Sequence, residues 1–173
     1  MQRLIDHSVL RYCNALAHSI PTPGGGSCAA LVGVLGVALL EMSMGYSSFS
    51  SSDLKVVRKI RRMLIGLVDK DAGAYRRVVQ TRNGTERQRQ KAWLKATEVP
   101  LEIYQQCRQA IRLAKAWQDS IKPTLKSDWA AGEMFLKSAC AAAALNVREN
   151  IKRLKDSRER DRLMQEWRRL KTR

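Results

Sequence analysis

Residues 21–27 read Pro-Thr-Pro-Gly-Gly-Gly-Ser, and residues 28–40 continue as Cys-Ala-Ala-Leu-Val-Gly-Val-Leu-Gly-Val-Ala-Leu-Leu. This stretch predicts a helix that begins at Pro23, because Thr22 is a good N-cap and proline suits the first helical position. We expect this helix to continue to about Tyr46. Small residues recur along it, and such residues let a neighbouring backbone approach closely. The helix is therefore expected at the centre of a bundle or at a subunit contact.

Four further helical segments flank this one. Their apolar residues recur at spacings of three and four, which is typical of helices with one buried face, and turns rich in proline, serine or Asn-Gly separate them. Pro100 lies inside a continuous helical pattern, so a kink rather than a stop is expected there. The segments run approximately over 4–18, 53–82, 85–120 and from 127 past 150. The sequence thus predicts a single all-α domain over residues 1–173, an antiparallel bundle of about five long helices.

The chain is strongly basic, with 32 basic and 16 acidic residues and a net charge of +16. Such a charge concentrates anions near the surface, so nucleic acid, acidic lipid, or a polycarboxylate or phosphate metabolite are candidate partners. A solvated surface of basic side chains is the other interpretation. Part of the excess lies in a helical tail from about residue 152 to Arg173. This tail has no base-reading motif, so only nonspecific nucleic-acid binding is expected from it.

The four cysteines and two histidines show no metal-binding spacing. We therefore expect no metal site. We interpret Cys13, Cys28, Cys107 and Cys140 as small buried apolar residues in a reducing compartment. The N-terminus lacks the apolar core of a signal peptide, and the apolar stretch 28–40 is too short to span a bilayer. A cytoplasmic protein without a membrane span is expected.

Gly24, Gly25, Gly26 and Ser27 combine the properties of a binding site at the predicted helix start. The first amides of a helix have no internal partners, and the helix dipole adds partial positive charge there. Glycines also let a ligand approach the backbone itself. The stretch thus predicts a corner that binds an anion or a carbonyl group. A tight turn that merely requires glycine is the alternative.

Asp71 falls on the apolar stripe of segment 53–82, four residues after Leu67. A carboxylate in that position is expected to face the interior, where it needs a partner or a cavity because an unpaired buried charge is costly. A perturbed interior carboxylate is a good general acid or base, and a buried ion pair with an arginine is the alternative. The stripe itself consists of Val56, Ile60, Met63, Leu67, Ala74 and Val78.

Two more pairs of polar residues stand out in the last long segment. Ser127 and Asp128 open it, either as cap residues or as side chains that project into a site at the helix start. Asn146 and Asn150 are four residues apart in alanine-rich surroundings. Because asparagine is a poor helix former, a specific hydrogen-bonding role is expected for this second pair.

Taken in order, these stretches resemble the formimidoyltetrahydrofolate cyclodeaminase and methenyltetrahydrofolate cyclohydrolase family. The glycine stretch and its Ala/Gly-rich helix resemble the opening of that family, and four later stretches follow in the right order. They are 67–72 (Leu-Val-Asp-Lys-Asp-Ala), 96–101 (Ala-Thr-Glu-Val-Pro-Leu), Ser127-Asp128 and 146–150 (Asn-Val-Arg-Glu-Asn). The resemblance covers about residues 4–152.

The resemblance implies an all-helical homodimer that binds folate near the subunit contact and needs no metal or organic cofactor beyond the tetrahydrofolate substrate. It implies that Gly24, Gly25, Gly26 and Ser27 border the folate. Asp71 is then the expected acid or base, with Asp128 second. The other expected substrate-binding residues are Pro23, Asp69, Lys122, Ser127 and Asn146. The basic surface suits a folate with a polyglutamate tail.

Two reactions on the one-carbon bridge follow from the resemblance. We expect hydrolysis of 5,10-methenyltetrahydrofolate to 10-formyltetrahydrofolate, with the ammonia-releasing cyclodeaminase reaction as the alternative. The chain departs from the family at residues 45–49 (Gly-Tyr-Ser-Ser-Phe), which lack the usual basic residues, and at Lys122, where family members tend to have asparagine. A catalytically inactive scaffold of the same fold, binding folate, another anion or nucleic acid, is therefore a further alternative.

Overall fold

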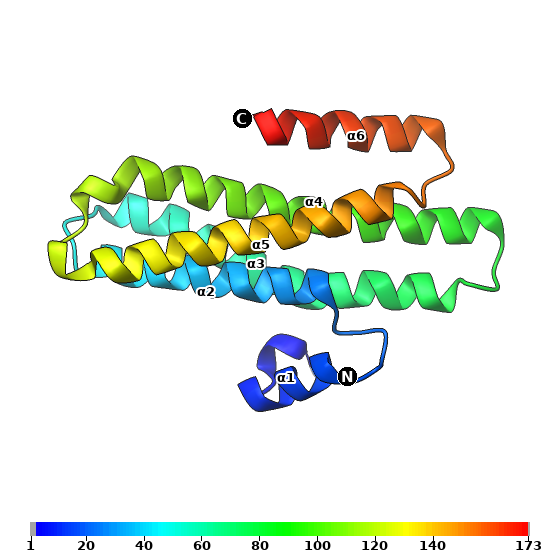
Figure 1. Cartoon of the computed structure of the whole chain (residues 1–173), viewed down its shortest axis with the longest axis horizontal. Coiled ribbons are helices and arrows are strands. Elements are labelled where there is room, and N and C mark those ends of the chain that lie inside the picture. Colours follow the sequence, from blue (N-terminus) through cyan, green and yellow to red (C-terminus); the bar gives the residue numbers. More distant parts are fainter. Residues whose placement is uncertain (1–2, 173) are drawn as a thin grey trace.

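The computed structural model describes residues 3–172, and within that range it consists of helices and the turns that join them (Figure 1). The all-α bundle predicted from the sequence is confirmed. Three short 3-10 turns cover Leu4–Asp6, Gln118–Ser120 and Pro123–Leu125. The α-helices are α1 (Val9–Ala17), α2 (Gly25–Gly45), α3 (Ser51–Gln80), α4 (Glu86–Trp117), α5 (Lys126–Ile151) and α6 (Ser157–Thr172).

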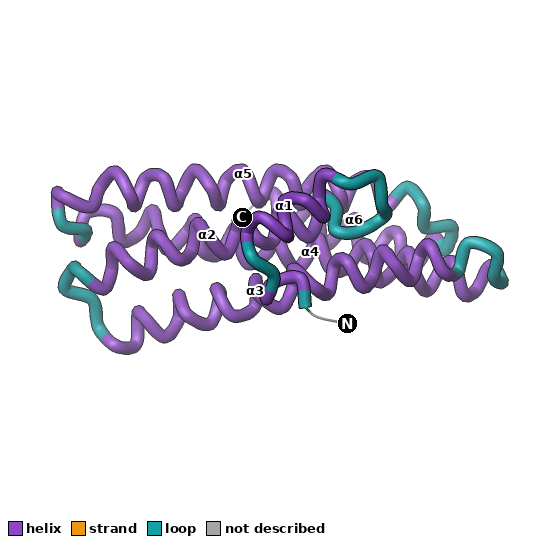
Figure 2. The backbone as a smooth tube through the Cα atoms, turned by 90° about the horizontal axis from the view of Figure 1, so that it is seen from below, coloured by secondary structure: helices purple, strands orange, loops and turns teal. Residues whose placement is uncertain are grey.

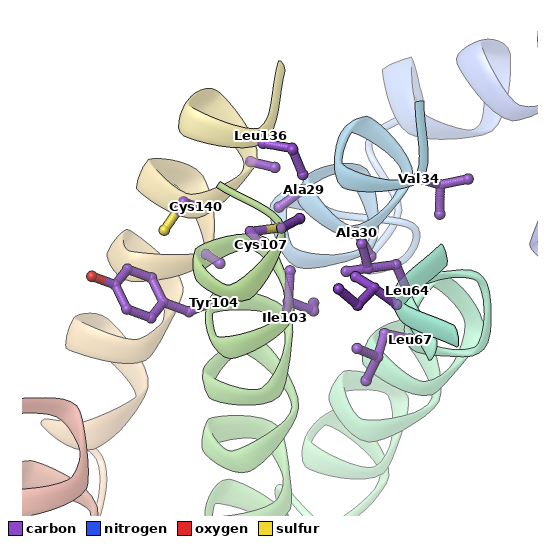
Figure 3. Close-up of a cluster of buried hydrophobic side chains, with 14 of the residues drawn as sticks. Ala29, Ala30, Val34, Leu64, Leu67, Ile103, Tyr104, Cys107, Leu136 and Cys140 are labelled. Carbon is purple, nitrogen blue, oxygen red and sulfur yellow. The ribbon is translucent and has the colours of Figure 1, made fainter. Parts of the chain in front are cut away.

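Helices α2 to α5 form an antiparallel four-helix bundle, which is elongated in both views (Figures 1 and 2). Each packs against its neighbour in sequence, and α5 closes the ring against α2. Short connections favour this up-and-down arrangement because they can only join adjacent antiparallel helices. Side chains from all four helices meet in the core, as Figure 3 shows for Ala29, Ala30, Leu64, Leu67, Ile103 and Leu136.

Helix α2 is one of the four helices of the ring, packed between α3 and α5. Its small residues allow α5 to come very close: a Cβ atom at Gly36 would lie 2.9 Å from the carbonyl oxygen of Gly132, and the reverse is equally true. By length and composition α2 is also apolar enough to cross a membrane, yet half of its apolar stretch is buried inside the bundle. The prediction that α2 lies at the centre is therefore wrong, because the outer side of the helix leaves Leu35 and Met42 exposed.

The starts of α3 and α4 follow from capping residues. The side chains of Ser50 and Thr85 each accept a hydrogen bond from the backbone amide three residues later. In turn, the side chains of Asp53 and Gln88 accept one from the backbone amide of the cap residue. Such reciprocal boxes satisfy two otherwise unpaired amides and fix where a helix begins.

The buried face at the start of α3 lies one residue later than the spacing suggested. Val56 is 40% exposed, whereas Val57 and Leu64 are buried. Ile60 and Leu67 are buried as predicted. The apolar residues on both sides of Val56 fit two helical faces about equally well, so only the position of α2 decides between them.

Helix α4 continues through Pro100, as predicted, and α5 compensates for the missing hydrogen bond. Proline has no amide N–H, so the carbonyl of Ala96, four residues earlier, loses its helical donor. The side-chain amide of Asn150 donates to that carbonyl at 2.7 Å. The hydrogen-bonding role predicted for Asn150 is therefore confirmed, and it joins α5 to α4 at the point where α4 lacks its own bond.

Both ends of the chain differ from the sequence prediction. The segment 4–18, expected as one helix, is divided into a 3-10 turn and α1, with Ser8 capping α1. The fifth helix does not continue into the basic tail. It ends at Ile151, and α6 returns along α4 (Figure 1), where the rings of Trp167 and Tyr104 lie 4.7 Å apart.

Candidate active site

Helix α2 starts two residues later than predicted. Gly24 is the N-cap and Gly25 the first helical residue, so Thr22 and Pro23 belong to the preceding turn. The Cys28 amide makes the first bond of the helix, to the carbonyl of Gly24 at 3.0 Å. The earlier amides, at Gly25 and Gly26, lie in the first turn, where a helix offers no internal acceptor.

Asp71 of α3 lies directly against this helix start. Its carboxylate accepts a hydrogen bond from the Ser27 amide. A Cβ atom at Gly26 would overlap the carboxylate, so no other residue type fits there without displacing Asp71. The helix dipole favours a negative charge in this position. The glycine at residue 26 is therefore explained by the approach of a side chain rather than by a turn.

Asp71 is an ionisable group with little compensation for its burial. Burial raises the pKa of Asp71 from 3.8 to about 6, and the Ser27 amide opposes this shift more weakly. Among residues 3–172 no lysine or arginine forms an ion pair with it, so the alternative of a buried Asp–Arg pair is wrong. A carboxyl group with such a pKa exchanges its proton readily near neutral pH.

Ser27 supports Asp71 from behind. Ser27 is fully buried, and its hydroxyl lies 3.0 Å from the hydroxyl of Tyr12, which is also buried. This contact holds α1 against the start of α2. Burial also raises the pKa of Tyr12, so the phenol remains neutral. Ser27, predicted to border a ligand, thus faces the protein interior and reaches Asp71 through its backbone.

A cavity of about 460 Å³ opens at this corner. It brings together residues of α2, α3, α4 and α5, and α3 and α4 extend past the start of α2 as a hairpin that forms one side (Figure 1). Five of the predicted site residues line it, namely Gly24, Gly25, Gly26, Asp71 and Asn146. The others are Pro21, Thr22, Tyr75, Val79, Arg82, Ala96 and Asn150.

Asn146 faces the helix start from α5. Its side-chain amide donates to the carbonyl of Ala142 at 3.1 Å. A Cβ atom at Gly25 would lie 3.6 Å from Nδ2 and 3.8 Å from Oδ1 of Asn146. The bare backbone of Gly25 and the Asn146 amide therefore form one polar edge of the cavity, opposite the carboxylate of Asp71.

Tyr75, Val79 and Arg82 were missed in the sequence, although a simple signal was present. Tyr75 and Val79 follow Asp71 by four and eight residues, a spacing that keeps them on one helical face, and Arg82 comes in the turn just after α3. Tyr75 also meets Trp93 of α4 edge to face, with ring centroids 6.3 Å apart. The outer wall of the cavity is thus aromatic and apolar and ends in a guanidinium group.

Asp69 does not belong to the cavity. Its carboxylate accepts hydrogen bonds from the amides of Leu4 at 2.6 Å and Ile5 at 3.5 Å. Because two residues along a helix turn a side chain to another face, Asp69 and Asp71 point in different directions. Asp69 thus anchors the N-terminal segment and does not line the cavity that Asp71 lines.

Lys122, Ser127 and Asp128 lie at the opposite end of the bundle. Asp128 is separated from Asn146 by continuous helix, which at about 1.5 Å per residue amounts to roughly 27 Å. The Lys122 amide donates to the hydroxyl of Ser47, beyond the end of α2. Within one chain these residues do not reach the cavity that Asp71 lines. Pro23 is buried beside the cavity and does not line it.

The cysteines follow the prediction only in part. Cys107 and Cys140 are buried, whereas Cys28 is half-buried and Cys13 is exposed. Within the described range 3–172, no three His, Cys, Asp or Glu side chains gather closely enough to hold a metal ion. The chemistry available in the cavity is therefore that of one carboxyl group, backbone amides, two asparagines, a threonine hydroxyl, a phenol and an arginine.

Comparisons with known proteins agree on one family. The sequence profile of the formiminotransferase-cyclodeaminase family matches residues 8–169. The chain is 31% identical over 171 residues to a methenyltetrahydrofolate cyclohydrolase of Methylorubrum extorquens, covering 87% of this chain and 82% of that protein. The crystal structure of a formiminotetrahydrofolate cyclodeaminase from Thermotoga maritima has the same fold, with a TM-score of 0.90 at 21% identity. That match covers 96% of this chain and 89% of the other.

Proposed function

Because the chain belongs to the formiminotransferase-cyclodeaminase family, whose characterised relatives act on folates, we propose that it hydrolyses 5,10-methenyltetrahydrofolate to 10-formyltetrahydrofolate. One observation carries the proposal: a carboxyl group without a basic partner, Asp71, lies against the glycine start of α2 in a cavity of about 460 Å³. The 31% identity to a cyclohydrolase supports this choice of reaction. The reaction needs no metal and no cofactor besides the folate.

The chemistry of the substrate matches that of the site. The one-carbon bridge of the substrate is part of a cation delocalised over two nitrogens, and an ionised Asp71 stabilises it. Water adds to the bridge carbon while Asp71 accepts one of its protons. The bond between that carbon and N5 then breaks, the proton passes from Asp71 to N5, and the hydroxyl proton is released. The formyl group remains on N10.

The cyclodeaminase reaction is the second candidate. There the N5 nitrogen of the folate attacks the formimino carbon, and ammonia departs after an acid has protonated it. With a pKa of about 6, Asp71 is mostly ionised at neutral pH. An ionised carboxylate suits the base required by hydrolysis better than the acid required by deamination. For this reason we place hydrolysis first.

A direct assay tests the proposal. Purified protein is mixed with methenyltetrahydrofolate, and the decay of its absorbance is compared with decay in buffer. We expect faster decay with the wild-type protein and a loss of at least ~10²-fold in rate for Asp71→Asn. Asp128→Asn makes the same chemical change far from the cavity and is expected to keep the wild-type rate.

The outcomes separate the candidates. Decay at the buffer rate combined with ammonia release from formimidoyltetrahydrofolate would favour the cyclodeaminase. Folate binding without either reaction would favour the inactive scaffold. A loss of rate in Asp128→Asn equal to that in Asp71→Asn would mean that the far end of the bundle, in one chain or across two, also takes part.

We further propose that the protein is a homodimer. Several large apolar side chains on α1, on α2 and just beside these helices remain exposed, and exposed apolar surface marks sites of protein–protein contact when it is contiguous. A second copy of the chain would bury them. They are Val9, Leu10, Ile20, Leu35, Met42 and Tyr46. Light scattering behind a sizing column is expected to give twice the chain mass, and a monomer would contradict the proposal.

A further inference from the structure

The proposed reaction uses only the inner end of the cavity, at Asp71. The outer half follows the end of α3, with Tyr75 and Val79 on the same face as Asp71, and continues to Arg82 in the turn after the helix. The wall thus presents a carboxylate, a phenol ring, an isopropyl group and a guanidinium in sequence. A molecule that extends from Asp71 along this wall meets a flat apolar stretch and then a positive charge.

Arg82 has no acidic partner, in contrast to Arg89 and Lys155 nearby. Arg89 donates to Glu86 and to the carbonyl of Gly84, and Lys155 pairs with Glu86 as well. The guanidinium of Arg153 lies 5.8 Å from the centre of the Trp93 ring. Arg82 is exposed, and among residues 3–172 no acidic side chain forms an ion pair with it.

Arg82 also stands where two hollows join. It lines the main cavity and a smaller recess of about 150 Å³ beside it, which Arg89 and Trp93 complete. Tyr75 and Val79 belong to both hollows. The smaller recess therefore extends the main cavity outward past Arg82, toward a second guanidinium at Arg89.

We propose that Arg82 binds the glutamate carboxylate of the folate, with Tyr75 and Val79 against its p-aminobenzoyl ring. This inference rests on the proposed function and identifies the residue that selects substrates carrying a glutamate. Arginine suits the task because its planar fork can make two parallel hydrogen bonds to one carboxylate. A lysine or a neutral residue at this position lacks that geometry.

The lengths agree. In a folate, a benzoyl ring, an amide and one Cα separate N10 from the glutamate carboxylate, roughly 10 Å by standard bond lengths. From Asp71 to Gln80, the last residue of α3, the helix rises about 14 Å, and Arg82 follows in the turn after it. Asp71 and Arg82 line the same cavity, so a ligand that starts at Asp71 and extends along α3 reaches Arg82. With the bridge carbon at Asp71, the glutamate falls at Arg82.

The test compares two substrates, with and without the glutamate, in the wild-type protein and in the Arg82→Gln variant. Steady-state kinetics are measured with methenyltetrahydrofolate and with its pteroate analogue, which lacks the glutamate. Arg82→Gln should raise KM for the folate roughly tenfold to a hundredfold, as the loss of a charge-assisted pair does, with kcat within about twofold. For the pteroate analogue, wild type and Arg82→Gln should have the same KM.

Arg77→Gln is the matched control. Arg77 lies on α3, five residues before Arg82, and is exposed, but it faces a separate groove with Gln80 and Lys91. Arg77→Gln removes the same charge from the protein and is expected to leave both KM values unchanged. An equal effect of Arg77→Gln would mean that Arg82 acts only through the general attraction of a basic surface for an anion, and this would overturn the proposal. So would an Arg82→Gln effect of the same size on both substrates.

The failure of this inference can be told from failure of the proposed function. If wild type has no cyclohydrolase activity, binding of p-aminobenzoylglutamate is measured by calorimetry with wild type, Arg82→Gln and Arg77→Gln. Binding that only Arg82→Gln weakens supports the glutamate site without the reaction. Turnover with a KM that Arg82→Gln leaves unchanged supports the reaction and contradicts the glutamate site.

Discussion

At the scale of single residues, the ionised form of Asp71 that the proposed reaction requires also lowers the stability of the folded protein. Its carboxyl group is mostly buried and has a pKa of about 6, above the 3.8 of an exposed aspartate. The folded state therefore holds the proton more firmly than the unfolded state between these values. As a consequence the contribution of Asp71 to stability falls as pH rises from about 4 to about 6, by at most about 3 kcal/mol.

Asp71→Asn should for this reason be more stable than wild type at pH 8 and similar to it at pH 4. Asparagine keeps the shape of the side chain but carries no charge that burial can penalise. Urea unfolding at the two pH values measures the difference directly. An equal gain at both pH values would mean that the charge of Asp71 is not the cause.

Gly26 gives a second prediction at this scale. Gly26→Ala places a methyl group where the Asp71 carboxylate lies. Either Asp71 or the helix start must shift, so we expect a loss of activity of at least ~10²-fold, because a displaced acid or base no longer reaches its proton. Circular dichroism should show the helical content of wild type. Full activity in this variant would contradict the placement of Asp71.

At the scale of secondary-structure elements, the pairing of α4 with α5 rests on Pro100, Ala96 and Asn150. Asn150→Ala removes the donor to a carbonyl that proline leaves unpaired, which should reduce the free energy of unfolding by about 1–3 kcal/mol. Pro100→Ala restores an amide to α4. In the double variant the loss caused by Asn150→Ala should be smaller, and urea titrations of the four proteins measure this coupling. Strict additivity would show that the two residues act independently.

The same scale explains how far the sequence alone could lead. Proline, glycine and capping residues predicted the start of each bundle helix, and the ends of α2, α3 and α4, to within a few residues, since those signals act locally. The separate helix α6 was missed because Asp156, whose carboxylate accepts bonds from the amides of Arg158 and Glu159, lies inside a uniformly charged stretch. No apolar spacing marked a break there.

The sequence predicted the site residues that belong to local patterns. It did not predict which residues approach the site because of the direction in which each helix runs. Gly24–Gly26 and Asp71 meet as expected. Asp128 was grouped with them although α5 runs antiparallel to α2, which places its start at the far end of the bundle. Asn146, near the other end of α5, reaches the cavity for the same reason.

At the scale of the whole molecule, the net charge of +16 is expected to act on substrate capture. For a polyglutamylated folate, kcat/KM should fall as salt is added, whereas kcat should change little, because screening weakens attraction over distances beyond about 8 Å in physiological salt. Kinetics over a salt series check this. Any binding of nucleic acid through the basic surface should weaken with salt in the same way and show no sequence preference.

The proposed function depends on the carboxyl group of Asp71, which lies against the start of α2, so the titration of this group is the most direct test. The pH dependence of kcat/KM for methenyltetrahydrofolate hydrolysis, corrected for the reaction in buffer, should rise to a plateau with an inflection near pH 6. Asp71→Asn should lose this inflection together with the rate. A wild-type profile that falls above pH 6, or an Asp71→Asn variant that keeps both the inflection and the rate, would contradict the role assigned to Asp71.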